Sequence, residues 1–196
     1  MSTKTFTRKA RLLSAAVSAA ALLGSAGVAT ADTSTNLTLD CPFPLIGTQS
    51  LQSIVTTAIP ATAEINKPTG SFNISAANQI PSDAAVGLGL VGAKTLEGSA
   101  AAKSRLVQSS GTLPLTVPLT IPSTSVPSSG AFEVVASGQT PSLTFTAQDT
   151  IDIFVDDITL DITARTADGS VAPAPVGEFT SDCAIQGGST KLTSFD

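Results

Sequence analysis

Aspartates are concentrated in one short part of the second half of the chain. They are Asp149, Asp152, Asp156, Asp157 and Asp161. Hard cations such as Ca²⁺ bind several carboxylate and carbonyl oxygens, and Asp152, Asp156 and Asp157 could supply such ligands. The spacing lacks the glycine that an EF-hand loop requires. A solvated, negatively charged strand face accounts for the same residues, so the calcium site is the weaker of two interpretations.

Side chains that could carry out catalysis are scarce. The chain contains no histidine, so neither a Ser-His-Asp triad nor a Cys-His pair can form. Ser99 and Lys103 are the nearest candidates for a Ser–Lys pair, but on a strand both would face solvent on one charged face. Tyrosine and tryptophan are also absent, which weighs against stacking platforms for sugars. We therefore expect a protein that is not an enzyme.

Three glycines, Gly87, Gly89 and Gly92, have the spacing G-x-G-x-x-G of dinucleotide-binding loops. Such a site needs a strand directly before the glycines and a helix that opens on them. Here Pro81 precedes the glycines and a strand-like sequence follows them. We interpret the spacing as chance in a stretch rich in alanine and glycine, and we expect no cofactor.

The chain has two cysteines, Cys41 and Cys183, near the two ends of the part that follows residue 31. Both fall on the apolar, inward parity of strand-like segments, and an even pair in an exported chain is most simply a disulfide. We predict that this bond ties the first strand to a late strand across the core. Two free, buried thiols are the alternative.

Residues 1–31 have the composition of a cleaved signal peptide. Four basic residues lie among the first eleven, an uncharged stretch rich in Ala, Leu and Val follows at 12–28, and Ala-Thr-Ala at 29–31 is a cleavage site. The stretch is too short and too often broken by Ser and Gly for a transmembrane anchor. We expect a secreted, extracellular protein with one domain at residues 32–196 and no membrane span after cleavage.

All fifteen acidic residues, but only six of the ten basic residues, follow residue 31. A surface with this surplus of negative charge repels nucleic acid and anionic lipid. We therefore expect no nucleic-acid partner, and we expect a monomer whose partner is an unknown protein or a component of the cell envelope.

The elements that must position these residues are mostly strands. Apolar residues alternate with polar ones in short segments that Pro, Gly and Ser separate, as in residues 37–43, 96–106, 132–136, 143–147 and 179–185. The pattern predicts an all-β domain. One short helix is predicted within residues 81–94, where Ser82 is an N-cap candidate.

The segment 112–122 carries three prolines, Pro114, Pro118 and Pro122, on one parity. Because backbone N–H groups alternate along a strand, all three missing donors lie on the same side. We predict an edge strand whose open side is blocked against pairing.

The segment 150–163 changes parity at Asp156-Asp157: Ile153 and Val155 share one phase, and Ile158 and Leu160 share the other. Either a β-bulge or a tight turn explains the change. Further along, Asp168-Gly169 at the centre of "TADGSV" predicts a turn.

"CPFPLIGTQ" and "VDDITLDITARTADGSVAPAPVGEFTSDC" resemble the beginning and the end of an actinobacterial exported domain family of unknown function. The resemblance implies an immunoglobulin-like β-sandwich with a terminal cysteine pair, and it carries no catalytic or ligand residue onto this chain. We expect a structural or interaction module of the bacterial cell exterior. The alternatives are a secreted protease inhibitor that presents a loop such as Ser123–Gly130, and a Ca²⁺-dependent adhesion module.

Overall fold

The computed structural model describes residues 30–60 and 62–195. The predicted signal peptide therefore lies outside the described residues, apart from its last two positions. The described part is almost entirely β-structure, as predicted, with one helix. The elements are β1 (Thr30–Phe43), β2 (Gly47–Pro60), β3 (Asn73–Ile80), α1 (Ser82–Leu90), β4 (Thr95–Gln108), β5 (Gly111–Ser125), β6 (Phe132–Gln139), β7 (Ile151–Arg165), β8 (Glu178–Gly188) and β9 (Lys191–Phe195).

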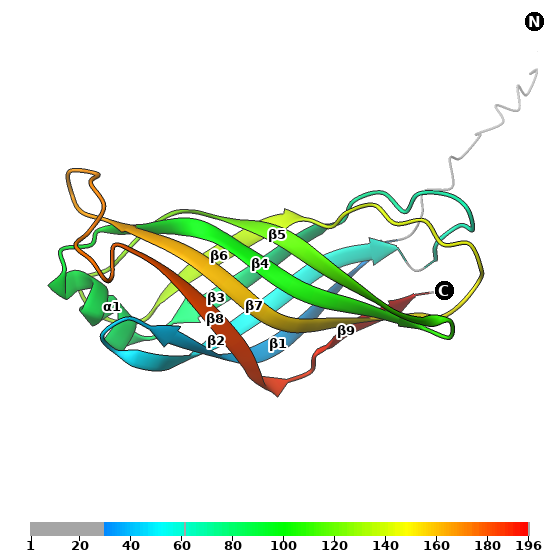
Figure 1. The fold of residues 1–196 in the computed structure, drawn as a ribbon, viewed down its shortest axis with the longest axis horizontal. Helices are drawn as coiled ribbons and strands as arrows, with labels where there is room; N and C mark the ends of the chain where they lie inside the picture. The colour runs from blue at the N-terminus through cyan, green and yellow to red at the C-terminus, as the bar shows by residue number, and fades with distance from the viewer. Residues whose placement is uncertain (1–29, 61, 196) are drawn as a thin grey trace, which may run out of the picture.

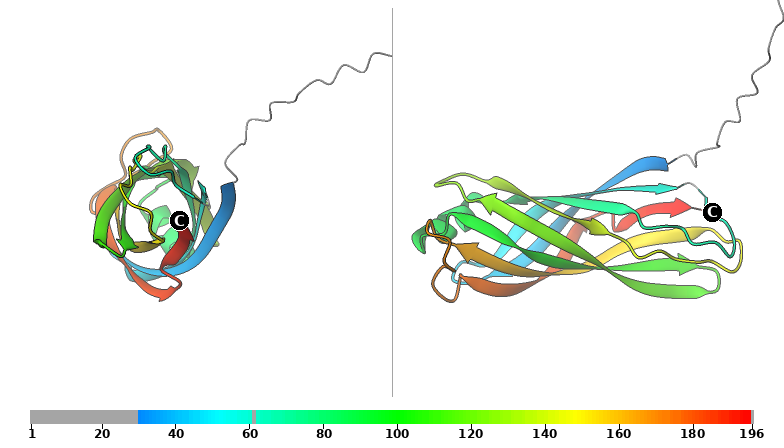
Figure 2. Two further views of the ribbon diagram at one scale, coloured as in Figure 1. Left: turned by 90° about the vertical axis from the view of Figure 1, so that its right-hand side faces the viewer. Right: turned by 90° about the horizontal axis from the view of Figure 1, so that it is seen from above.

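Eight of the strands form a closed antiparallel barrel. Their order is β4-β5-β6-β3-β2-β1-β8-β7, and β7 also pairs with β4 from Asp152 to Arg165, which closes the ring. Viewed along the axis, the strands form a closed ring (Figure 2). The expected immunoglobulin-like sandwich is wrong. A sandwich core and a barrel interior both take every second side chain, so the alternation in the sequence fits either arrangement.

The barrel is long, and its two ends differ (Figure 1). The helix end carries α1, the turn at 44–46 and the connection at 166–177. The loop end carries the 62–72 loop, the β4–β5 hairpin turn, the segment 140–149 and β9. β9 lies beside β7 at Ile151–Phe154, next to the stretch of β7 that pairs with β8.

The core fills the inside of the barrel. Alternate side chains of each strand point inward, and the most buried of them on β1 and β2 are Leu37, Leu39, Cys41, Leu51 and Val55. Polar residues on the opposite parity face solvent. The core is thus a cylinder of aliphatic side chains, and large aromatic residues are few within it.

Helix α1 begins at Ser82 and closes the helix end of the barrel with its buried Ala84, Ala85 and Leu88. The predicted helix is confirmed, but the N-cap position belongs to Pro81, and no side chain caps the helix. Ser82 is therefore the first helical residue and not the cap. Among the described residues, no helix is long and apolar enough to cross a membrane.

The prediction that the proline-rich strand is an edge is wrong. β5 pairs with β4 over almost its whole length, and it has a second strand, β6, as its neighbour on the other side. Its pairing with β6, however, is limited to Leu119↔Gly138 and Thr120↔Ser137. Since β4 takes the N–H groups of one parity, the missing donors of Pro114 and Pro118 face the β6 side. The prolines therefore leave a sparsely bonded seam in the barrel wall.

The parity change in β7 is a β-bulge within one continuous strand. Ala102 of β4 pairs with Ile158, whereas Ser104 pairs with Val155. Two residues of β7, Asp156 and Asp157, therefore oppose one residue of β4. Because of the bulge, the apolar residues before it and those after it all point into the barrel interior.

The predicted disulfide between Cys41 and Cys183 is confirmed, and its Cα atoms lie 4.2 Å apart. It does not cross the core between two sheets. It links β1 to β8, which are neighbours in the wall, since Leu39 pairs with Ile185 and Asp40 with Ala184. The bond thus fastens the first strand of the barrel to the last one.

Candidate functional site

The barrel interior contains space that its side chains leave unfilled. Near the loop end lies a cavity of about 60 Å³, which we call the loop-end cavity. Strands β2, β3, β4, β5, β7 and β9 contribute to its wall, and so do the loops at that end. Its lining includes Val55, Ile59, Phe72, Leu106, Leu115, Val117, Leu143, Phe145, Val155 and Leu192. Among the described residues that line it, Thr69, Ser104 and Thr140 add polar groups.

A second cavity, of about 40 Å³, lies further toward the helix end, and we call it the central cavity. It shares Ala76, Leu119 and Ile158 with the loop-end cavity, so the two lie in series along the barrel. Asn78 is the polar side chain in its wall. The Asn78 Nδ2 donates hydrogen bonds to the carbonyl oxygens of Ala76 at 2.9 Å and Val134 at 3.2 Å.

One inward hydroxyl is left without a partner. Ser53 is 1% exposed, and its Oγ has no hydrogen-bond partner among the described residues. The two buried threonines of β1 and β2 do have hydrogen-bond partners. The Thr35 Oγ1 donates to the Ser189 carbonyl, and the Thr57 Oγ1 donates to the Asn73 carbonyl. An unpaired buried hydroxyl is costly, and such a group calls for a water or a ligand atom.

Ser53 and Asn78 are direct partners across β2 and β3. Side chains of directly opposed residues in an antiparallel pair lie on the same face, with Cβ atoms about 4.5–5.5 Å apart. The hydroxyl and the amide therefore lie side by side on the inner wall, midway along β2. They form a small polar spot on the inner wall.

A third pocket, of about 180 Å³, lies at the helix end between the 44–46 turn and α1. Phe43 lines both this pocket and the central cavity, and its ring lies 5.6 Å from that of Phe179. Two leucines at the pocket, Leu45 and Leu90, are 74% and 83% exposed. Leu45 also has a φ of 69°, a conformation that residues other than glycine rarely adopt. The aromatic pair separates this exposed apolar surface from the interior.

The aspartates considered as calcium ligands are each placed differently. Asp152 accepts bonds from the Lys191 Nζ at 2.9 Å and the Ser194 Oγ at 2.8 Å, and the Lys191 bond is the main reason for its lowered pKa. Asp156 forms an ion pair with Arg105, and Asp157 is exposed at the bulge. Within the described residues, no three metal-ligating side chains come together.

The other candidates from the sequence lie apart from the interior. Ser99 and Lys103 are exposed on the outer face of β4, at the same parity. Gly87 and Gly89 lie inside α1 and not in a loop before a helix, so the arrangement differs from a dinucleotide site. In the segment Ser123–Gly130, Val126 is buried and donates its N–H to the Lys94 carbonyl at 2.8 Å.

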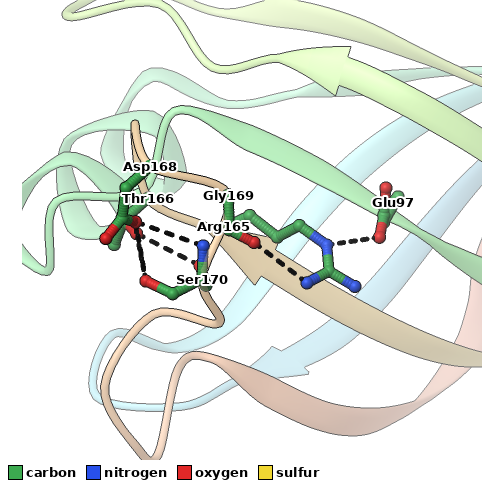
Figure 3. Close-up of polar contacts among 6 residues, drawn as sticks. All are labelled: Glu97, Arg165, Thr166, Asp168, Gly169 and Ser170. Carbon is green, nitrogen blue, oxygen red and sulfur yellow. Dashed lines mark hydrogen bonds and ion pairs between the residues drawn. The ribbon is translucent and has the colours of Figure 1, made fainter.

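The predicted turn at Asp168-Gly169 is confirmed and is held by a polar cluster (Figure 3). The Asp168 carboxylate accepts hydrogen bonds from the Thr166 Oγ1 and from both the N–H and the Oγ of Ser170, at 3.1 and 2.7 Å. These bonds, the Thr166 bond above all, lower the pKa of Asp168 to about 2. Arg165 donates to Glu97 at 2.6 Å and to the Gly169 carbonyl at 3.1 Å, which fastens the turn to β4.

The interior cavities were missed by the sequence reasoning, although a signal for them exists. Small residues occupy inward positions on several strands, among them Ala76, Ala100, Ala102, Ser104 and Ala136. A row of small side chains facing one interior leaves volume that the opposite wall must fill. Whether that volume is filled depends on which strands face each other, and this is set by ring closure.

Comparison with known proteins gives a family but no function. Residues 38–193 match a family described as "Family of unknown function (DUF6801)". Neither a curated protein nor a solved structure matches the chain. The match covers most of the chain and spans β1 to β9, both cysteines and all the residues that line the two interior cavities. The protein therefore belongs to this family of unknown function.

Proposed function

We propose that the protein is an exported, non-enzymatic binding module that takes up a small apolar ligand inside its barrel. The observation that carries this proposal is the unfilled aliphatic space of the loop-end and central cavities, in series along one axis. Eight-stranded barrels are just wide enough either to be filled by side chains or to hold one small ligand. In this barrel the inward side chains leave part of the interior unfilled.

The chemistry of the lining selects the ligand class. A charged or strongly polar molecule would lose its hydration and find few partners, because the wall offers mainly aliphatic carbon. Asn78, in the wall of the central cavity, could form a hydrogen bond with a single polar group of the ligand. The cavities, of about 60 and 40 Å³, are small, which limits the ligand to a short apolar molecule.

Export and the absence of catalysis are parts of the same proposal. The signal-peptide composition of residues 1–31 and the pairing of both cysteines support an extracytoplasmic location. The lack of histidine supports binding without chemistry. The expected partner, an unknown protein or a component of the cell envelope, stays a part of this proposal.

Titration of the full protein with short-chain alcohols, followed by calorimetry, tests the proposal. Ala76 lines both cavities, so Ala76→Leu fills the space where they meet. We expect this variant to fold and to bind at least about tenfold more weakly than the wild type. Ala184→Leu adds the same volume on the outer face of β8, where Ala184 is exposed, and serves as the control.

Two results would contradict the proposal. One is a wild-type protein that binds no alcohol of any chain length at millimolar concentration. The other is unchanged affinity in Ala76→Leu, which would place any binding elsewhere, for example on the exposed Leu45 and Leu90.

A further inference from the structure

Helix α1 is apolar on its inner and on its outer side. The stretch 84–90 contains no polar side chain. Ala85 and Leu88 are buried against the end of the barrel, whereas Val86 and Leu90 are exposed. A helix at a protein surface normally carries polar residues on its outer side, and a helix that is apolar all round is normally buried. The outer side of α1 therefore has the composition of a covered surface.

The β1–β2 turn beside this helix presents another exposed leucine in an unfavourable conformation. Among the described residues, Leu45 and Asn66 are the two residues other than glycine with a positive φ, at 69° and 59°. Asparagine is often found in this region, whereas a leucine there is uncommon. The Leu45 side chain is exposed, so packing in the core does not explain why a leucine occupies this position. An outlier that the core does not require points to a function.

Leu45 and Leu90 both line the helix-end pocket of about 180 Å³, which lies between the turn and α1 (Figure 1). Every side chain that lines this pocket is apolar. An apolar cavity of about 150 Å³ can hold one benzene molecule, so the pocket has room for one six-membered ring. A free ring would fill the pocket but leave Val86 and the outer side of α1 in water. A protein segment that carries the ring as a side chain would cover both.

The charges beside the pocket select the kind of protein. Asp83 lies one turn before the pocket-lining Gly87 on the same side of α1, and Glu178 directly precedes the pocket-lining Phe179. Both carboxylates are exposed, and neither forms an ion pair within the described residues. Lys94 leads into β4, which lies across the ring from β1 and β2. A positively charged partner is therefore attracted to the pocket, whereas a second copy of this chain would bring like charges together.

We propose that the helix-end pocket is the docking site of a partner protein, which inserts one aromatic side chain between α1 and the β1–β2 turn and places a basic residue beside Asp83. Aromatic and arginine side chains are enriched in protein interfaces, and an anchor of this kind is strongest where apolar residues exclude water around it. Leu45 and Leu90 would do so here. The pair Phe43 and Phe179 separates this site from the barrel interior, so the inference does not depend on a ligand inside the barrel.

Three peptides test the anchor and the charge on the full protein: acetyl-Lys-Phe-Lys-amide, acetyl-Lys-Ala-Lys-amide and acetyl-Glu-Phe-Glu-amide. NMR of methyl groups locates the binding, because the ring of the bound phenylalanine shifts the methyl resonances of Leu45 and Leu90. The first peptide should shift them at millimolar concentration, the second should not, and the third should bind more weakly than the first. Asp83→Asn should weaken the first peptide about threefold. Asp157→Asn removes an exposed carboxylate at the bulge and should leave its affinity unchanged.

Two matched pairs of variants test the pocket itself. A methyl group at Gly87 would lie 3.2 Å from the Ile46 Cγ2 in the pocket wall, whereas one at Gly89 would meet nothing within 4 Å. Both alanine variants favour the helix, but Gly87→Ala alone should weaken the first peptide, by about fourfold. Leu45→Gly removes the unfavourable left-handed side chain, so the unfolding midpoint should stay or rise while the peptide binds more weakly. Asn66→Gly, in the loop at 62–72, should leave binding unchanged.

Equal affinity for the Phe and Ala peptides, or equal affinity in Gly87→Ala and Gly89→Ala, would overturn the aromatic anchor. Equal affinity for the Lys and Glu peptides would overturn the basic partner. Toluene that binds as tightly as the first peptide would make a free ring the occupant, and methyl shifts that depend on protein concentration without peptide would make it a second copy. Either result would overturn the proposal. Ala76→Leu fills the interior and should leave peptide binding unchanged, so this inference and the proposed function can fail separately.

Discussion

Asp168 shows how a short turn sets the titration of one carboxylate. Its ordinary pKa of 3.8 falls to about 2, first because the Thr166 hydroxyl donates to it and then because Ser170 does. The folded pKa lies below the unfolded one, so the stability gained from these bonds is present above the unfolded pKa. It is lost as the pH falls from near 4 through about 2.

We expect the Asp168 carboxyl carbon to titrate by NMR with a midpoint of about 2. Thr166→Val should raise this midpoint toward 3.8, and Ser170→Ala should raise it by less, because the Ser170 N–H still donates. A midpoint that is unaltered in both variants would show that these bonds do not hold the turn in solution.

At the level of elements, the bulge in β7 decides which side chains enter the barrel. Two residues, Asp156 and Asp157, oppose one residue of β4, and the apolar parity shifts there by one. Without the extra residue, every side chain beyond it would change face, since the side-chain period of a strand is two. The sequence already indicated this change, because the phase of Ile153 and Val155 differs from that of Ile158 and Leu160.

Deletion of Asp157 should therefore prevent folding. It moves Ile158, Ile162 and Ala164, all buried, to the outer face. Far-ultraviolet circular dichroism and proteolysis of the variant should show loss of the sheet. The control Asp157→Ala keeps the residue count and removes only an exposed carboxylate, so it should fold and differ in stability by no more than about 0.5 kcal/mol. A folded deletion variant would show that β7 can slide and that the bulge is dispensable.

Elements with a local signal could be predicted from the sequence, and features that depend on closure could not. The Asp168-Gly169 turn, the helix around Leu88 and the parity change at Asp156 each follow from neighbouring residues. The three prolines of β5 correctly indicated a side with few strand bonds, but the same pattern fits an edge and a sparse seam. The cavities behind Ala76 depend on partners far apart in the chain, and no local pattern encodes those.

At the scale of the whole molecule, closure depends on a few pairings between distant strands. β1 pairs with β8, and the disulfide reinforces this contact across 142 residues of sequence. β4 pairs with β7 and completes the ring on the other side. The alternation alone did not distinguish a barrel from a sandwich, because neither of these pairings leaves a trace in the local pattern.

The double variant Cys41→Ala/Cys183→Ala should fold but lose about 2–5 kcal/mol of unfolding free energy. The reason is the long loop that the bond closes, which restricts the unfolded chain. Guanidinium unfolding measures the difference, and the wild type under reducing conditions is the control, which should match the variant. Oxidised wild type and variant with the same unfolding midpoint would contradict a stabilising role.

The adjacency of β1 and β8 also has a consequence for how fast the barrel can assemble. The partner of β1 is β8, the last strand of the ring along the chain, so the ring cannot close before β8 has been synthesised. Until then β1 has an open side with unpaired N–H and C=O groups, which is a template for wrong pairing. A topology so rich in long-range contacts folds on the slow side, in about milliseconds to seconds. During that interval the nascent chain is at its most vulnerable to aggregation and to proteases.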